Sequence, residues 1–284
     1  MIDNLLNGTF KYEDVYEKHL LNQVVSEAQR RESHRKIQGV YYFSVTKLLQ
    51  CFLRQFLSKK LKRLPSLDGL KIMDFGEMNH QWHQSVLSKE FGKIHRAERS
   101  FTYTVEEGKL YIAGRVDDLF AIPVQKDDEL EYICMELKTQ GFSVAKRKYP
   151  KIEHVAQLTF YMASIGSTKG YLVYISRAGF PERDDDLDKK VVTKTFFVDL
   201  DWDSVSELIE RARSMYNYYE HDKLPPPESR MQRERSSECS YCEVKKECDF
   251  LMNKRQELVE KNAETWIDIH LLFPEVFPDD NSYS

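Results

Sequence analysis

The sequence lacks the features that mark a secreted, membrane-spanning or strongly basic protein. Among its 284 residues, no apolar run approaches the roughly 20 residues that a membrane-spanning helix requires. The first eight residues, Met-Ile-Asp-Asn-Leu-Leu-Asn-Gly, carry acid in place of the basic region that opens a signal peptide. We therefore expect a cytoplasmic protein.

The chain also lacks an excess of positive charge and a disulfide framework. Its net charge is −4 with a pI near 6.1, so binding to nucleic acid would require a local basic groove. Five cysteines in a chain of this length do not form a disulfide framework. Where cysteines cluster in a reducing compartment, they indicate a metal site or catalysis. Internal repeats and low-complexity tracts are absent.

Two apolar, β-prone segments lie near the middle of the chain, at residues 111–122 and 132–137. Pro123 follows the first segment, and charged residues fill much of the interval up to Glu129. Residues 124–129 are therefore predicted to be a turn, and the two segments to pair as a hairpin.

The second predicted strand ends in Glu136-Leu137-Lys138. Because side chains alternate across a strand, Glu136 and Lys138 share a face while Leu137 points into the core. With Asp117 from the paired strand, two carboxylates and a backbone carbonyl can bind Mg²⁺ or Mn²⁺ and leave positions open for water. A neighbouring lysine can orient that water and stabilise charge on phosphorus. These residues together predict phosphodiester hydrolysis.

A Glu-x-Lys pattern on a strand is more often an exposed ion pair, so the assignment depends on the rest of the chain. The periodicity predicts further helices at 12–31, 44–60, 70–91, 151–165, 202–219 and 251–265. It predicts further strands at 96–104, 170–176 and 191–200. Together these elements indicate an α/β protein.

Three polar residues on the predicted helices are further candidates. His80 follows Gly76 by one turn, although a histidine in this position is more often a hydrogen-bonded packing residue, and His83 competes with it. Gln157 and Tyr161 are four residues apart and therefore share a helix face, a pattern that ordinary boundary packing also produces.

The cysteines near the C-terminus have the spacing of metal ligands. Cys239 and Cys242 form a Cys-x-x-Cys pair, and Cys248 follows six residues later. Three thiolates do not complete a tetrahedral site. Cys51, which the pattern places inside the helix at 44–60, is a better fourth ligand than Cys134, which shares the strand of Glu136. The spacing alone fits zinc and an iron–sulfur cluster equally well, and unligated thiols remain the simplest alternative.

The order of these elements resembles the RecB-like branch of the PD-(D/E)XK nucleases, and more closely the CRISPR-associated exonuclease family, the fourth Cas protein. The resemblance covers about residues 44–250. It rests on six elements in order: Cys51, Gly76-x-x-x-His80, Gly114-x-x-Asp117, Glu136-x-Lys138, Gln157-x-x-x-Tyr161 and Cys239-x-x-Cys242-x₅-Cys248.

The resemblance implies a role for each motif. Mn²⁺ or Mg²⁺ would be held by His80, Asp117, Glu136 and the backbone carbonyl of Leu137. Lys138 would be the catalytic lysine, and Gln157 and Tyr161 would position DNA or support that lysine. A [4Fe-4S] cluster, favoured over zinc by the resemblance, would be held by Cys51, Cys239, Cys242 and Cys248. The departures are the absence of a proline after Cys51 and the segments beyond the shared core.

The resemblance implies a restriction-endonuclease-like α/β fold, with a mixed central sheet flanked by helices and an iron–sulfur subdomain that joins the two ends of the chain. We expect a helical extension at 1–40, a nuclease domain at 41–250 and a C-terminal helix and tail at 251–284. The expected activity is exonucleolytic hydrolysis of single-stranded DNA in CRISPR spacer acquisition, with the CRISPR integrase subunits as partners.

Basic residues near the expected site are candidates for DNA binding, although ordinary surface solvation explains any one of them as well. They are Lys59, Lys60, Lys62, Arg63, Lys146, Arg147, Lys148 and Lys151. The alternatives are a stand-alone or viral RecB-like recombination or repair nuclease, a non-catalytic DNA-binding assembly subunit, and a zinc-ribbon adaptor.

Overall fold

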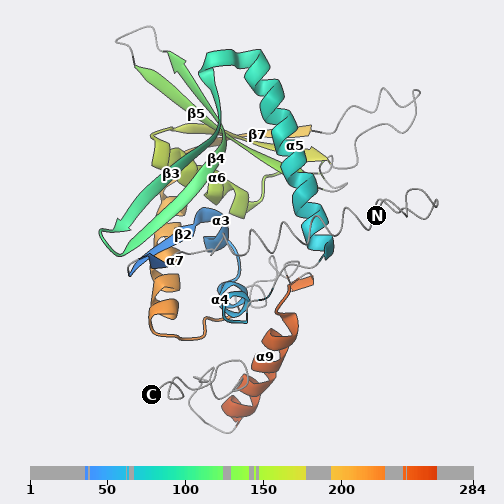
Figure 1. The fold of residues 1–284 in the computed structure, drawn as a ribbon, viewed down its shortest axis with the longest axis vertical. Helices are drawn as coiled ribbons and strands as arrows, with labels where there is room; N and C mark the ends of the chain where they lie inside the picture. The colour runs from blue at the N-terminus through green and yellow to red at the C-terminus, as the bar shows by residue number, and fades with distance from the viewer. Residues whose placement is uncertain are drawn as a thin grey trace, which may run out of the picture. The chain divides into compact units, whose positions relative to one another are not determined.

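The computed structural model describes residues 36–37, 39–61, 63, 67–123, 129–140, 144, 147–176, 193–227, 239–240 and 242–260 (Figure 1). Several predicted features lie outside these residues. They are the helix at 12–31, most of the hairpin turn at 124–129, and Lys62 and Lys146 among the basic candidates.

The chain divides into two compact units. The larger comprises Ser33–Gln50 and Gly76–Lys223, and the smaller comprises Met1–Glu32, Cys51–Phe75 and Leu224–Ser284. Helix α5 (Leu67–Phe91) runs from the smaller unit into the larger one.

The larger unit is built on a seven-stranded mixed sheet. Its spatial order is β1-β2-β4-β5-β6-β7, and β3 also pairs with β4. The pairs β2–β4 and β5–β6 are parallel, and the other pairs are antiparallel. The strands are β1 (Lys36–Ile37), β2 (Val40–Ser44), β3 (His95–Glu106), β4 (Leu110–Pro123), β5 (Leu130–Gln140), β6 (Lys169–Ser176) and β7 (Thr193–Asp199). The prediction of an α/β fold with a mixed central sheet is confirmed.

Strand β4 has three neighbours although a strand has only two edges. It pairs with β3 from Leu110 to Phe120. It also pairs with β2 over residues 110–113 and with β5 over residues 118–123, so these two strands share its other edge. Residues 114–117 lie between the two ladders, and Asp117 ends this interval. The sheet therefore forks at Asp117, because β2 pairs with this edge of β4 before it and β5 pairs with the same edge after it.

Helices pack against the sheet and against one another. Helix α6 (Ile152–Ile165) contacts β5 and β6, and α7 (Trp202–Glu220) contacts α6, α3 (Val45–Leu48) and β4 (Figure 1). Asp201 caps α7 by accepting hydrogen bonds from two backbone N–H groups. Gly166 ends α6 in the left-handed conformation with a φ of 81°, which favours glycine. A short 3₁₀ turn (Gly92–Ile94) connects α5 to β3.

The prediction of one continuous helix at 44–60 is wrong. Ser44 caps α3 as expected, since its Oγ accepts a hydrogen bond from Lys47 N at 3.3 Å. However, α3 ends at Leu48, and α4 (Phe52–Lys60) begins after Cys51, which is its N-terminal cap residue. The physical reason is Arg211, whose guanidinium donates to the carbonyls of Leu48 at 2.7 Å and Gln50 at 3.3 Å. Carbonyls that a continuous helix would pair internally are satisfied by α7 instead.

In the smaller unit, ion pairs and a hydrogen bond connect α4 and the residues just after it to the start of α9 (Lys245–Glu260) and to Glu243 before it. Arg54 Nε donates to both carboxylate oxygens of Glu243, at 2.9 and 3.2 Å, and Ser58 Oγ donates to the same group at 2.6 Å. Arg63 pairs with Glu247 at 2.5 Å. Helix α9 begins earlier than the predicted residue 251, so Cys248 lies in its first turn.

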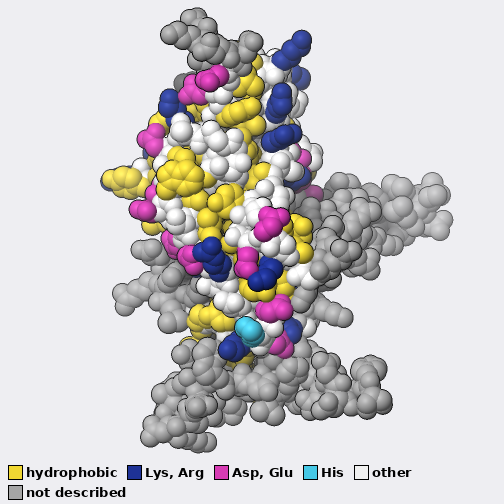
Figure 2. Space-filling view, turned by 90° about the vertical axis from the view of Figure 1, so that its left-hand side faces the viewer, with side chains coloured by type: hydrophobic (Ala, Val, Ile, Leu, Met, Phe, Trp, Pro, Cys, Tyr) yellow, Lys and Arg dark blue, Asp and Glu magenta, His cyan; other side chains and the backbone are white. Residues whose placement is uncertain are grey.

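Acidic, basic and apolar side chains are interspersed over much of the face drawn in Figure 2. This distribution agrees with a net charge of only −4. Within the part of the chain that the structure describes, no helix is long and apolar enough to cross a membrane.

Candidate active site

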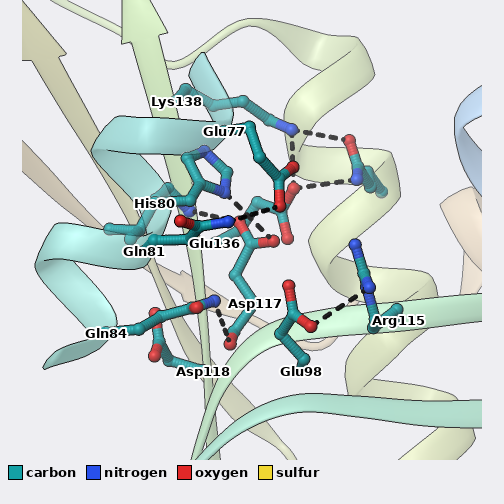
Figure 3. Close-up of polar contacts among 12 residues, drawn as sticks. Glu77, His80, Gln81, Gln84, Glu98, Arg115, Asp117, Asp118, Glu136 and Lys138 are labelled. Atoms are coloured by element: carbon teal, nitrogen blue, oxygen red, sulfur yellow. Dashed lines mark hydrogen bonds and ion pairs between the residues drawn. The ribbon is translucent and has the colours of Figure 1, made fainter. Parts of the chain in front are cut away.

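Asp117, Glu136 and Lys138 come together where the β2–β4 ladder has ended and the β4–β5 ladder begins. Lys138 Nζ lies 2.6 Å from Glu136 Oε1, and Leu137 N donates a hydrogen bond to Asp117 Oδ2 at 2.9 Å. Figure 3 shows the three side chains pointing toward one another. Alternation along β5 explains why Glu136 and Lys138 share a face. The backbone contact of Leu137 fixes the Asp117 carboxylate beside them.

Helix α5 adds His80 and Gln84 to this group. His80 Nδ1 lies 3.5 Å from Asp117 Oδ1, and Gln84 Nε2 donates to the backbone carbonyl of Asp117 at 3.2 Å. His80 and Gln84 are one turn apart and so present the same helix face to the strand. His83, the competing histidine, packs instead against Trp82, with ring centroids 4.6 Å apart.

Helix α6 supplies Gln157, which bonds to one oxygen of Glu136, and Tyr161, which bonds to Gln157. Gln157 Nε2 donates to Glu136 Oε1 at 2.8 Å and to Tyr161 Oη at 2.8 Å. Gln157 Oε1 accepts a hydrogen bond from Lys138 Nζ at 3.0 Å. One amide therefore bridges the acid and the lysine. Tyr161 packs against Gly114, where a Cβ would stand 2.9 Å from its ring and 2.4 Å from Phe101 Cζ.

The charges of the site shift one another's pKa values. Burial, and then the charge of Asp117, raises the pKa of Glu136 to about 8. Burial also acts on Asp117, but the hydrogen bond and charge of His80, with Lys138 and Leu137 N, lower its pKa below the ordinary value. Burial disfavours the charged forms of His80 and Lys138, yet the pKa of each is raised because the nearby carboxylates outweigh it. A cation beside Asp117 and Glu136 is therefore electrostatically favourable.

Glu136 has an oxygen that the protein leaves without a partner. Glu136 is only 2% exposed, and its Oε2 has no hydrogen-bond partner among the described residues. A buried carboxylate oxygen in this state is costly unless another group satisfies it. Together with the Asp117 carboxylate and the Leu137 carbonyl, the donor set fits a hard divalent cation. This fit is one of donor chemistry and not of a preformed side-chain cage, because within the described residues no three His, Cys, Asp or Glu side chains, the cysteines included, are placed to hold a metal ion.

Sequence reasoning missed other polar groups at this site. Gln84 supports Asp117, and Figure 3 places Glu77 on the same stretch of α5 as His80. Their positions, three residues before and four after His80, are the signal that could have found them. Glu98 and Arg115 form an ion pair at 3.1 Å near Asp117. Glu98 has a φ of 55°, rare for this residue type, and no pattern in the sequence indicates it.

A buried histidine–carboxylate pair lies next to Asp117 in the chain. His95 Nε2 and Asp118 Oδ1 are 2.6 Å apart with both side chains fully buried, and Ser88 Oγ lies 3.0 Å from His95 Nδ1. The pair connects β3 to β4, where Ala97 is the ladder partner of Asp118. Sequence reasoning did not identify it, because His95 and Asp118 are far apart in the chain.

The cysteines fall into two places. Cys51, Cys239, Cys242 and Cys248 belong to the smaller unit and form no disulfide. Burial raises the pKa of Cys242 above the ordinary value for a thiol. Cys134 is fully buried in the larger unit, and burial raises its pKa to about 12. Cys134 is therefore a core residue of the larger unit. Within the described residues no group of cysteines is placed to hold a metal ion, and Cys51 as a fourth ligand stays a prediction.

Comparison with known proteins identifies the family. The model of the PD-(D/E)XK nuclease superfamily matches residues 18–249, most of the chain. The chain therefore belongs to the PD-(D/E)XK nuclease superfamily. A comparison with curated proteins found no match.

Three solved structures are similar to the chain. One, named SSO0001, is 21% identical with a TM-score of 0.53, over 80% of this chain and 93% of that one. The alkaline exonuclease LHK-Exo from Laribacter hongkongensis is 12% identical with a TM-score of 0.41, over 64% and 89%. A phage-related exonuclease from Haemophilus somnus 129PT is 15% identical with a TM-score of 0.35, over 53% and 72%. The first likeness supports the fold.

The raised pKa of Glu136 predicts how the metal-free protein responds to pH. Between the ordinary glutamate pKa, about 4.3, and about 8, the folded protein binds more protons than the unfolded chain. The free energy of unfolding therefore falls as pH rises through this window. Glu136→Gln in EDTA should lose less stability between pH 5 and 8 than the wild type does, as measured by thermal denaturation.

The difference between the two pH profiles reports the titration of Glu136 together with the part of the His80 and Lys138 pKa shifts that Glu136 causes. Adding Mn²⁺ at pH 8 should raise the Tm of the wild type and leave Glu136→Gln nearly unchanged. Parallel pH profiles for the two proteins would contradict the assignment of a strained, ionisable Glu136.

Proposed function

We propose that the protein is a divalent-cation-dependent DNA nuclease. The observation that carries this proposal is the unpartnered, buried oxygen of Glu136 beside Asp117, with Lys138 in contact with the same carboxylate. The superfamily to which the chain belongs adds independent support. Mn²⁺ or Mg²⁺ would be held by Asp117, Glu136 and the Leu137 carbonyl, with His80 as a further ligand.

When bound, the cation would polarise the phosphodiester and lower the pKa of the attacking water. Lys138 would hold that water through its ammonium group and stabilise the negative charge that develops on the phosphate oxygens. Gln157 keeps Lys138 and Glu136 in fixed relative positions, because its amide bonds to both side chains. Tyr161 in turn accepts a hydrogen bond from Gln157 and fixes its amide plane. Gln157 and Tyr161 are therefore positioning residues.

The finer proposal is an exonuclease that acts on single-stranded DNA ends during CRISPR spacer acquisition, with the integrase subunits as partners. The order of the motifs supports it. A stand-alone or viral RecB-like recombination or repair nuclease would use the same site. A non-catalytic assembly subunit has no evident need for the complete set of acid, acid and lysine. Arg147 and Lys148, with Lys146 outside the described residues, are the proposed DNA contacts near the site.

The smaller unit would hold a [4Fe-4S] cluster through Cys51, Cys239, Cys242 and Cys248, with zinc as the less favoured occupant. Four thiols that form no disulfide are a donor set that either group accepts. Cys51 opens α4, and Cys242 directly precedes Glu243, which bonds to Arg54 and Ser58 on α4. The cluster's proposed role is structural, since it would join segments that are remote in the chain.

Removing the site residues should abolish cleavage. On end-labelled single-stranded DNA with Mn²⁺, the wild type should degrade the strand, and Lys138→Ala should be slower by about 10²- to 10⁴-fold. Glu136→Ala should be at least as impaired, because it removes both a metal donor and the partner of Lys138.

A matched control exists on α5. His80→Ala should lower activity, whereas His83→Ala, which alters a side chain packed on Trp82, should retain it. If Glu136→Ala and the wild type cleave equally, the activity comes from another site or a contaminant. Binding of DNA without cleavage by the wild type would favour the assembly-subunit alternative.

The cluster proposal predicts a brown protein with iron and sulfide after anaerobic purification. Cys242→Ala should lose the colour and melt at a lower temperature, while Cys134→Ala should keep the colour because Cys134 lies in the other unit. A colourless protein with one zinc ion per chain would support a zinc site. A wild type without iron or zinc that melts like Cys242→Ala would exclude both.

A further inference from the structure

An arginine is fixed close to the candidate catalytic lysine. Its guanidinium, in Arg147, lies 4.7 Å from the ring centroid of Tyr174, and Nη2 donates to Gln140 Oε1 at 2.7 Å. Gln140 lies two residues beyond Lys138 on β5, a distance of about 7 Å along a strand. Tyr174 is the ladder partner of Lys138 on β6. The arginine is therefore held beside the site by two neighbouring strands.

Tyr174, on which the Arg147 guanidinium lies, is held by burial and by two hydrogen bonds. Tyr174 is fully buried, and its hydroxyl accepts a hydrogen bond from Lys151 N at 3.0 Å. The same hydroxyl lies 2.9 Å from Nδ1 of His154. Burial, and then the positive charges of Lys138, Lys151 and Arg147, hold the pKa of His154 far below its ordinary value. A neutral imidazole nitrogen can accept a hydrogen bond from the Tyr174 hydroxyl, so this hydroxyl is paired with both Lys151 N and His154 Nδ1.

Three cationic side chains surround Tyr174, and within the described residues one of them, Arg147, has no acid opposite it. Lys138 bonds to Glu136, and Lys151 lies 3.8 Å from Glu153. Arg147 has no carboxylate partner in the described part of the chain, and its Nε has no hydrogen-bond acceptor there. Lys151 also leaves the N-terminus of α6 without a side-chain cap. An anion is the group that would complete this environment.

Two large apolar residues that lie close to Arg147 in the sequence are exposed to solvent. Tyr149 is 78% exposed and Ile152 is 77% exposed, the largest fractions among the exposed large apolar residues of the described chain. Two such residues form too small a patch for a stable protein interface. An aromatic ring between cationic side chains is instead the combination that binds single-stranded nucleic acid, because bases stack on the ring while phosphates meet the charges.

We propose that Arg147, Tyr149, Lys151 and Ile152 form a subsite for one unpaired nucleotide next to the phosphodiester that is cut. Arg147 and Lys151 bind its phosphate, and Tyr149 stacks on its base with Ile152 beside the ring. A paired base is already stacked within a duplex, so Tyr149 selects unpaired strands. The subsite rests on the proposed nuclease function, since it supplies the strand to Lys138.

The test is the affinity for a fluorescently labelled oligothymidine, measured by anisotropy in EDTA, where cleavage cannot occur. Tyr149→Ala should weaken binding by about tenfold or more, and Tyr149→Trp should restore it. Binding of a duplex should change little in either variant. Trp202→Ala, which removes an aromatic residue that is 60% exposed at the start of α7, should bind the oligonucleotide like the wild type.

Arg147 has a readout that a purely structural role would not change. Arg147→Ala should reduce the slope of log Kd against log salt concentration by about 0.7, the value for one phosphate contact on a single strand. Circular dichroism and thermal denaturation would identify a variant that fails to fold, in which case Arg147→Lys, which keeps the charge, should keep the slope.

Unchanged oligothymidine binding by Tyr149→Ala would overturn the subsite, as would an equal loss of single-strand and duplex binding. The outcome is separable from that of the nuclease proposal. If Tyr149→Ala weakens binding but the wild type does not cleave with Mn²⁺, the subsite stands and the nuclease assignment fails. If the wild type cleaves and Tyr149→Ala binds normally, the nuclease assignment stands alone.

Discussion

The buried carboxylate of Glu136 is the constraint on which the rest of the site depends. One oxygen bonds to Lys138 and Gln157, and the other is buried without a partner in the described protein. Burying an ionised acid beside Asp117 is unfavourable, and for this reason the pKa of Glu136 is raised to about 8. A buried, unpaired acid is stable in a fold only where the surrounding packing holds it in place. Active sites are where such unfavourable arrangements are usually found.

The fork in the sheet brings Asp117 close to Glu136. Because β2 and β5 share one edge of β4, residues 114–117 are left between two ladders, and Asp117 is free to accept the N–H of Leu137. Helices α5 and α6 then approach the fork with His80 and Gln157. The larger unit alone contains every proposed catalytic group, whereas the smaller unit contains the proposed cluster cysteines. The proposed catalytic residues and the proposed cluster ligands thus lie in different units.

Local patterns predicted much of the fold and the site. Period-two alternation placed Glu136 and Lys138 on one face, and the four-residue spacing of Gln157 and Tyr161 placed both on one side of α6. The sequence could not indicate features set by remote partners. Arg211 breaks the helix that the sequence predicts through Cys51, although 163 residues separate it from Leu48. The contacts of Tyr174 with Arg147, Lys151 and His154 likewise depend on tertiary packing.

Direct titration of the protein with Mn²⁺ is the closest test of the proposed divalent-cation site at Asp117 and Glu136. Electron paramagnetic resonance of free Mn²⁺ would measure binding to the wild type, Asp117→Asn and Glu136→Gln without any DNA. We expect saturable binding by the wild type and about tenfold or greater weakening in each variant. Equal binding by all three proteins would contradict it and would place the cation elsewhere.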